Sequence, residues 1–230
     1  MRRIGLLGGM SWESTTLYYR MLNEGVRQRL GGLHSAEIIL HSVDFHDIEA
    51  CQKAGDWDAA AAILTEAASG LKRAGADFLV LATNTMHKVA ERIEAGSGLS
   101  LLHIADPTGQ ALRDAGVKTV GLMGTRFTME QDFYRSRLEH RFGLNLLTPA
   151  PADRDDIHRI IYGELCMGIA APASADRFTD IIQSLETAGA EAVILGCTEI
   201  TLLVGPANSP LPVFDTTALH AAAALDRALA

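Results

Sequence analysis

Cysteine is scarce in this chain, and the few cysteines present form no recognisable pattern. The 230 residues contain only three, Cys51, Cys166 and Cys197. An odd number without close spacing argues against a disulfide framework and favours reduced thiols. We therefore expect a cytoplasmic protein rather than a secreted protein that depends on disulfide bonds.

Long apolar runs and an excess of positive charge are also missing. No stretch of about 18 apolar residues occurs, so neither a transmembrane helix nor a membrane partner is expected. The first apolar run is broken by Gly8-Gly9 and followed by Glu13, which fits a β-strand better than a signal peptide. The formal net charge is −8 and the pI is near 5.4, which argues against a nucleic-acid partner.

The motifs of common cofactor and metal sites are absent as well. Gly8-Gly9-Met10-Ser11 is not G-x-G-x-x-G, and no P-loop lysine follows it. The segment is either an anion-binding start of the next helix or an ordinary turn; Gly8 alone favours the turn, whereas the whole stretch favours the anion site. His41 and Asp44 would point to opposite faces of a strand, so we interpret them, with His46, as solvated loop residues. We expect no cofactor and no metal.

Short apolar runs alternate with helical patterns along the whole chain. The predicted strands are residues 4–7, 37–43, 78–82, 101–104, 119–123, 144–147, 192–195 and 212–214. The predicted helices are residues 14–30, 56–74, 86–95, 107–115, 129–141, 153–164, 175–188 and 216–228. This alternation predicts parallel sheets with right-handed crossovers.

The two halves of the chain resemble each other. Residues 74–85 read AGADFLVLATNT and residues 188–199 read AGAEAVILGCTE, which places Thr83 opposite Cys197. Residues 4–8 similarly resemble residues 120–124, and Tyr19-Arg20 is echoed by Tyr134-Arg135. The repeat predicts an α/β fold of two pseudo-symmetric, Rossmann-like halves. Each half is a four-stranded parallel sheet flanked by helices, with the active site between them.

No low-complexity or proline-rich linker separates the halves. The predicted N-terminal domain comprises residues 1–105 and 214–230, and the C-terminal domain comprises residues 106–213. Ligands of open α/β sheets bind at the carboxyl ends of the strands. Four such ends are rich in glycine and polar residues: 8–11, 83–85, 124–125 and 197–199.

Each candidate residue at these ends also has a structural interpretation. Cys197 is either a base whose pKa is lowered by strand-end N–H groups or a small core residue, and its place in the repeat favours the base. Thr83 either binds substrate or caps the helix that starts near Met86. His87 could take a proton from Thr83, although a histidine in a first helical turn is more often structural. Cys166 is interpreted as a packing residue.

Four segments together resemble the aspartate/glutamate racemase family, and the resemblance covers essentially the whole chain. They are GLLGGMSWEST near the start, ATNTMHK at 82–88, IYGELCMG at 161–168 and GCTEI at 196–200. The resemblance implies a small acidic amino acid held between two α/β halves, and no cofactor. In the family, two cysteines flank the substrate α-carbon: one thiolate removes the α-proton and the other thiol protonates the opposite face.

The resemblance also implies a substrate site. Asn and Thr residues after the family's cysteines bind the α-carboxylate, and their counterparts here are Asn84, Thr85 and Thr198. Further candidates for substrate binding are Met10, Gln52, Thr125, Glu164 and Glu199.

The chain departs from the family pattern at two positions. Cys197 is the second cysteine, but Thr83 stands at the first. The resemblance assigns the L-enantiomer to the second cysteine, so it implies a racemase specific for L-aspartate and L-glutamate. Thr83 would serve the opposite face directly or through water. Gln52 stands where many relatives carry a basic residue, which leaves selectivity for one chain length open.

Two other functions remain compatible with the sequence. One is decarboxylation or isomerisation of a small diacid by a one-cysteine relative. The other is non-catalytic dicarboxylate binding, against which the retained Cys197-Thr198-Glu199 argues. A two-lobed enzyme of this size is often a homodimer, although no residue of the sequence specifies one.

Overall fold

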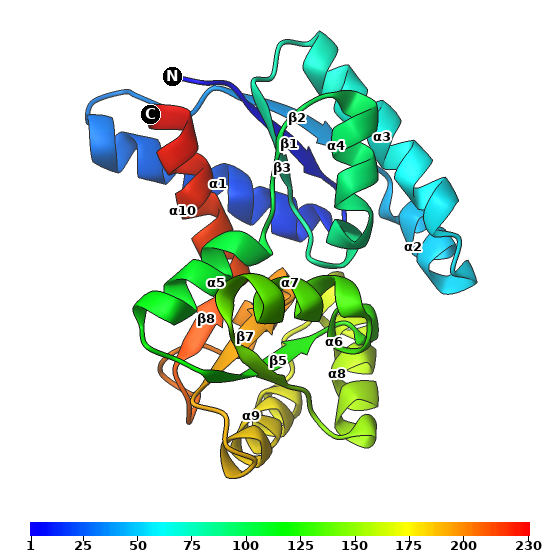
Figure 1. Cartoon of the computed structure of the whole chain (residues 1–230), viewed down its shortest axis with the longest axis vertical. Helices are drawn as coiled ribbons and strands as arrows, with labels where there is room; N and C mark the ends of the chain where they lie inside the picture. The colour runs from blue at the N-terminus through cyan, green and yellow to red at the C-terminus, as the bar shows by residue number, and fades with distance from the viewer. The chain divides into compact units, whose positions relative to one another are not determined.

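The computed structural model describes all residues from Met1 to Ala230 and divides into two compact units (Figure 1). Unit 1 comprises Met1–His103 together with His220–Ala230, and unit 2 comprises Ile104–Leu219. The sequence-based boundary at 213/214 differs from this division, because β8 (Val213–Asp215) pairs with β7 (Ala192–Gly196) and so stays in unit 2. Unit 1 is therefore built from two segments that are distant in sequence.

Unit 1 contains four strands and the helices that connect them. The strands are β1 (Ile4–Gly8), β2 (Ile38–Ser42), β3 (Phe78–Leu81) and β4 (Leu101–Leu102). The helices are α1 (Trp12–Leu30), α2 (Phe45–Ala54), α3 (Trp57–Arg73), the short 3₁₀ helix η1 (Thr85–Val89) and α4 (Ala90–Ser97). Most of α10 (Thr216–Leu229) also belongs to unit 1, although its first turn lies in unit 2.

Unit 2 likewise contains four strands and the helices that connect them. Besides β7 and β8 it contains β5 (Thr119–Gly124) and β6 (Asn145–Leu147). Its helices are α5 (Ala105–Asp114), α6 (Arg126–Glu130), α7 (Asp132–Phe142), α8 (Pro151–Gly163), η2 (Leu165–Met167), α9 (Pro172–Thr187) and η3 (Thr198–Leu202).

Each unit has one four-stranded parallel sheet, and the two sheets have the same topology. The strand order is β2-β1-β3-β4 in unit 1 and β6-β5-β7-β8 in unit 2. The predicted α/β fold, with two four-stranded parallel sheets flanked by helices, is thus confirmed.

The strand register supports the internal repeat. Ile4 pairs with Phe78 in unit 1, and Val120 pairs with Ala192 in unit 2. The alignment that matches Ile4 with Val120 also matches Tyr18 with Tyr134, and both tyrosines are fully buried. The sequence echo between Tyr19 and Tyr134 is therefore wrong by one residue.

Both faces of each sheet are covered by helices, so successive strand residues enter different cores. In β3, Leu79 and Leu81 pack with α2, α3 and α4, whereas Phe78 and Val80 pack with α1 and α10. Figure 1 shows these two groups of helices on opposite sides of the sheet of unit 1. A parallel sheet covered on both faces is the usual arrangement for all-parallel strands.

The sheet of unit 2 alternates in the same way. In β7, Val193 and Leu195 pack with α8 and α9, whereas Ala192 and Ile194 pack with α5 and α7. Cys197 follows Leu195 with the same parity and joins the core of α8 and α9. The position of Cys197 is thereby set by the alternation of side chains along a strand.

The helix α2 is missing from the sequence prediction. Residues 45–54 form α2, which Asp44 caps through a hydrogen bond from the His46 N–H at 3.0 Å. His41 lies in β2 and His46 in α2, so neither is a loop residue, but both are exposed to solvent as expected. Only Ile48 and Gln52 of α2 are buried, so the helix carries almost no apolar periodicity.

Candidate active site

The turn after β1 is closed by its own hydrogen bonds. The Gly9 N–H donates to Thr15 Oγ1 at 2.8 Å, and the Gly8 carbonyl accepts from the Val43 N–H at 3.1 Å. Gly9 has φ +93°, and a Cβ there would lie 2.2 Å from the Val43 carbonyl oxygen, so only glycine fits. Since the Gly9 N–H is already used, the geometry favours the turn interpretation of this segment. Met10, which follows, is buried in the core with α2 and α3.

The turn after β3 carries Thr83, Asn84 and Thr85. Thr83 is half-buried, whereas its neighbours from Leu81 to His87 are buried, so Thr83 is the residue of this turn that reaches the surface. The prediction that Thr83 caps a helix is wrong: η1 starts at Thr85 and has Asn84 at its N-cap position. Thr83 is left as a candidate for substrate contact.

Two other residues of unit 1 were singled out by the sequence. His87 contacts the backbone of Thr83, because its Nδ1 lies 2.7 Å from the Thr83 carbonyl oxygen. Gln52 is buried on α2, and its Nε2 donates to the sulfur of Met86 at 3.1 Å. The side chain of Gln52 thus lies against η1, the segment that follows Asn84.

In unit 2, Thr125 occupies the carboxyl end of β5. It is the N-cap of α6, and its Oγ1 accepts a hydrogen bond from the Thr128 N–H at 3.3 Å. Gly124, just before it, pairs in register with Gly196 of β7. Thr125 and Cys197 therefore follow directly on a pair of neighbouring strand residues.

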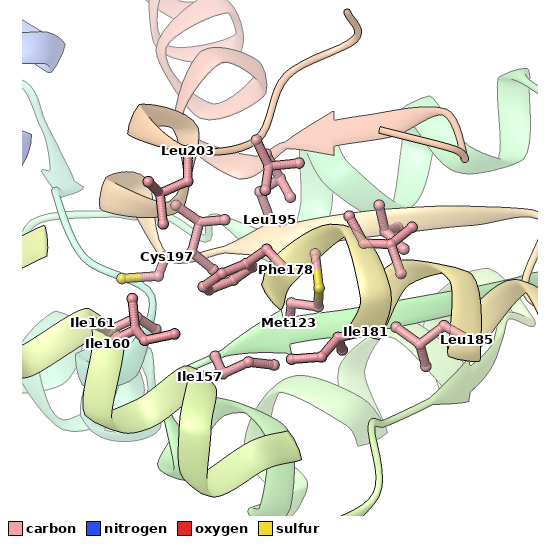
Figure 2. Close-up of a cluster of buried hydrophobic side chains, with 14 of the residues drawn as sticks. Met123, Ile157, Ile160, Ile161, Phe178, Ile181, Leu185, Leu195, Cys197 and Leu203 are labelled. Atoms are coloured by element: carbon pink, nitrogen blue, oxygen red, sulfur yellow. The ribbon is translucent and has the colours of Figure 1, made fainter. Parts of the chain in front are cut away.

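Cys197 lies at the carboxyl end of β7, at the edge of the core formed by α8 and α9. Figure 2 shows its sulfur pointing away from Phe178 and out of the cluster of apolar side chains. The residue is only 9% exposed. Its thiol donates a hydrogen bond to Glu199 Oε2 at 2.8 Å. Cys197 thus packs at the edge of the core, as the structural interpretation expected, and it also presents its thiol to a carboxylate.

The acidity of Cys197 differs from the sequence-based expectation. Burial, followed by the negative charge of Glu199, raises the pKa of the Cys197 thiol well above its ordinary value. A backbone hydrogen bond from Glu199 lowers this pKa, as expected of strand-end N–H groups, but burial and the nearby carboxylate outweigh it. Desolvation disfavours the thiolate, and a neighbouring carboxylate disfavours it further. In the structure, the Cys197 thiol faces a carboxylate oxygen that accepts its hydrogen bond.

Thr198 connects Cys197 to the start of α10. Its Oγ1 accepts a hydrogen bond from Thr217 Oγ1 at 3.1 Å, and the neighbouring Thr216 Oγ1 donates to the Leu195 carbonyl at 2.9 Å. Sequence analysis did not identify Thr216 and Thr217. The available signal was their position directly after the last predicted strand, at the same edge of the sheet.

Glu164 follows α8 and is held by neighbouring side chains. Its Oε2 accepts a hydrogen bond from Ser174 Oγ at 2.5 Å, and its Oε1 lies 3.4 Å from Arg159 Nη1. Cys166, two residues later, is half-buried against the core of α8 and α9, as the packing interpretation expected.

The candidate residues therefore form two groups, one in each unit. Unit 1 holds Met10, Gln52, Thr83, Asn84 and Thr85, and unit 2 holds Thr125, Glu164, Cys197, Thr198 and Glu199.

No group of three or more His, Cys, Asp or Glu residues could hold a metal ion. No helix has the length and apolar character needed to cross a membrane.

Comparisons with known proteins match this chain to racemases over nearly its full length. The family model described as Asp/Glu/Hydantoin racemase matches residues 7–224. The crystal structure of a putative Asp/Glu racemase from Yersinia pestis is similar over 100% of both chains, with 56% identity and a TM-score of 0.92. An aspartate racemase homologue from Pyrococcus horikoshii OT3 is similar over 100% of both chains, with 31% identity and a TM-score of 0.85.

A further relative is also an amino-acid racemase. The broad specificity amino-acid racemase RacX of Bacillus subtilis (strain 168) is 22% identical to this chain. The alignment covers 99% of this chain and 98% of that protein.

Proposed function

Because this chain belongs to the Asp/Glu/hydantoin racemase family and is an amino-acid racemase, we propose that its substrates are L-aspartate and L-glutamate and that it needs no cofactor. Cys197 removes the α-proton, and Thr83 serves the opposite face of the α-carbon directly or through water. The observation that carries the proposal is the equivalent placement of Thr83 and Cys197 after β3 and β7, the matching strands of the two sheets.

The contact between Cys197 and Glu199 gives the thiol proton an acceptor. The thiol proton moves to Glu199 Oε2, 2.8 Å away, which leaves a thiolate beside a neutral carboxylic acid. The thiolate then takes the α-proton, and the S–H bond forms as the C–H bond breaks. A substrate ammonium group near this pair would favour the charged thiolate by Coulomb attraction.

Neutral donors at the strand ends support an acidic substrate. Removal of an α-proton moves negative charge onto the α-carboxylate, and preorganised hydrogen-bond donors stabilise that charge. Asn84, Thr85 and Thr198 are buried at the relevant strand ends and supply such donors in the proposal. Met10, Gln52, Thr125, Glu164 and Glu199 complete the proposed substrate site.

Replacement of Cys197 by serine tests the proposal. The variant should lose solvent deuterium exchange at the α-carbon of L-aspartate and L-glutamate by several orders of magnitude, because a hydroxyl is a much weaker acid than a thiol. Proton NMR of substrate in D₂O measures the exchange, and circular dichroism checks the fold. Residual exchange within about tenfold of wild type, a barrier change of roughly 1.4 kcal/mol, would contradict the role of Cys197.

The same assay separates the alternative functions. A decarboxylase would release CO₂ from the diacid, and a binding protein would bind it without exchange at the α-carbon. We also propose a cytoplasmic location, because all three cysteines are free and free thiols are common in a reducing compartment. Assembly as a homodimer stays a prediction, and light scattering of the purified protein measures it.

A further inference from the structure

Three buried histidines and a buried tyrosine gather behind Thr83 within unit 1. His87 is 3% exposed, His103 9%, and His220 and Tyr18 are fully buried. The ring centroid of His87 lies 4.5 Å from that of His103 and 5.9 Å from that of His220. Polar rings are seldom buried together without a hydrogen-bonding purpose, and the proposed function uses none of them.

The hydrogen bonds of two of these rings fix where their protons lie. A carbonyl oxygen can only accept, so His87 carries a proton on Nδ1 and donates it to the Thr83 carbonyl at 2.7 Å. By the same reasoning His220 carries a proton on Nε2 and donates it to the Leu102 carbonyl at 2.8 Å. In the neutral His220 ring, Nδ1 then accepts from the Tyr18 hydroxyl at 2.8 Å. The His220 ring, which lies next to the His87 ring, is thus held by a hydrogen bond on each of its two nitrogens.

Thr83 is constrained on both sides of its α-carbon. Its N–H donates to the Leu81 carbonyl at 2.9 Å, and its C=O accepts from the His87 ring. With both backbone groups held, only rotation about the Cα–Cβ bond of Thr83 remains, and a β-branched side chain has few staggered positions. The direction of the Thr83 hydroxyl therefore depends on the His87 ring.

We propose that His87, supported by His220 and Tyr18, is the positioning residue that aims the Thr83 hydroxyl at the substrate. This inference rests on the proposed function, because it assigns the Thr83 side of the same site. It gives His87 no contact with the substrate. Displacing a reacting hydroxyl by about 1 Å can lower the reaction rate about 100-fold. A single ring contact can therefore control the rate of proton transfer on the Thr83 side of the substrate.

Asparagine and glutamine at position 87 separate positioning from bulk. The amide nitrogen of Asn lies close to where imidazole Nδ1 lies, whereas that of Gln lies closer to Nε2. Conversion of L-glutamate to D-glutamate should stay within about threefold of wild type in His87→Asn and fall at least about tenfold in His87→Gln. The loss should appear in kcat rather than in KM. Deuterium exchange into L-glutamate, which depends on Cys197, should stay unchanged in both variants.

Tyr18→Phe tests the support that Tyr18 gives to His220. It removes the hydroxyl that donates a hydrogen bond to His220 Nδ1 and keeps the aromatic ring. It should lower conversion about threefold and leave exchange unchanged. The matched control is Tyr134→Phe, which alters an equally buried tyrosine of unit 2 and should change neither rate. Equal losses of conversion and exchange in His87→Gln would reduce His87 to a structural residue, and no loss in that variant would overturn the proposal.

Nitrogen NMR of the histidine rings gives a readout that does not depend on activity. The His87 ring of the wild-type protein should be protonated on Nδ1, and an Nε2-protonated tautomer would overturn the proposal. A wild-type protein that neither exchanges nor converts L-aspartate or L-glutamate would instead refute the proposed function. The tautomer would still decide whether His87 holds the Thr83 carbonyl.

Discussion

Thr83 and Cys197 occupy equivalent places in their own units, but their side chains differ in acidity. A cysteine thiol ordinarily has a pKa of about 8.5, whereas a threonine hydroxyl has no comparable route to an anion. In the proposed mechanism, the substrate face that meets Cys197 can therefore lose its proton, and the face that meets Thr83 hardly can. Exchange of the α-proton should therefore be fast for L-substrates and slow for D-substrates.

Replacing Thr83 by cysteine should restore chemistry on both faces. In Thr83→Cys we expect D-glutamate to exchange its α-proton at a rate within about tenfold of L-glutamate, because each face then meets a thiol. Proton NMR of both enantiomers in D₂O measures the two rates, and Thr83→Ser is the matched control that keeps a hydroxyl. Equal D and L rates in the wild type would contradict the asymmetry and point to another base on this face.

The carboxylate of Glu199 should add to the effect of burial on the acidity of Cys197. Glu199→Gln removes the negative charge but not the burial, so the pKa of the thiol should fall while remaining above its ordinary range. The rate of alkylation by iodoacetamide should accordingly reach its midpoint at a lower pH in Glu199→Gln than in the wild type. Cys197→Ser supplies the background from Cys51 and Cys166. An unchanged or higher midpoint would contradict the assigned cause.

At the scale of elements, α8 and α9 supply the apolar core against which Cys197 packs. Phe178, Ile181 and Leu185 of α9 meet Ile157 and Ile161 of α8 in one buried cluster (Figure 2). Their spacing places them on one face of each helix. The cluster therefore links the stability of unit 2 to the position of the thiol.

Phe178→Ala should destabilise the protein by about 3–5 kcal/mol, because it removes a fully buried aromatic ring and leaves a cavity. Urea unfolding followed by circular dichroism measures the loss. Thr179→Ala, at the neighbouring half-buried position of α9, is the control and should cost much less. A loss below about 1 kcal/mol would mean that the core refills the space. The position of Cys197 would then not depend on this core.

The sequence predicted these elements well where burial is continuous. The eight strands lie within one or two residues of their predicted ranges in most cases, because strands covered on both faces are uninterrupted apolar runs. The helix α2 was missed because only Ile48 and Gln52 are buried in it. The raised pKa of Cys197 was not predictable, because it depends first on the burial of the thiol in the folded unit and then on the direction in which η3 turns Glu199.

At the scale of the whole molecule, the proposed reaction makes a geometric demand. Thr83 Oγ1 and Cys197 Sγ must stand on opposite sides of one tetrahedral carbon, so we predict a separation of about 7–9 Å with substrate bound. A crystal structure with an acidic amino acid or a tartrate-like anion measures this distance. Side chains that face away from a shared ligand would contradict the racemase mechanism, whatever the kinetics of single variants.

The discontinuity of unit 1 bears on how a newly synthesised chain folds. Ala221, Ala224 and Leu225 of α10 complete the core around Tyr18, and His220 completes the ring cluster behind Thr83. On the ribosome these residues emerge after all of unit 2, so the segment that carries Cys197 can fold first. Until then the apolar faces of α1 and β3 stay uncovered, and the nascent chain needs protection from aggregation for the time that translation of unit 2 takes.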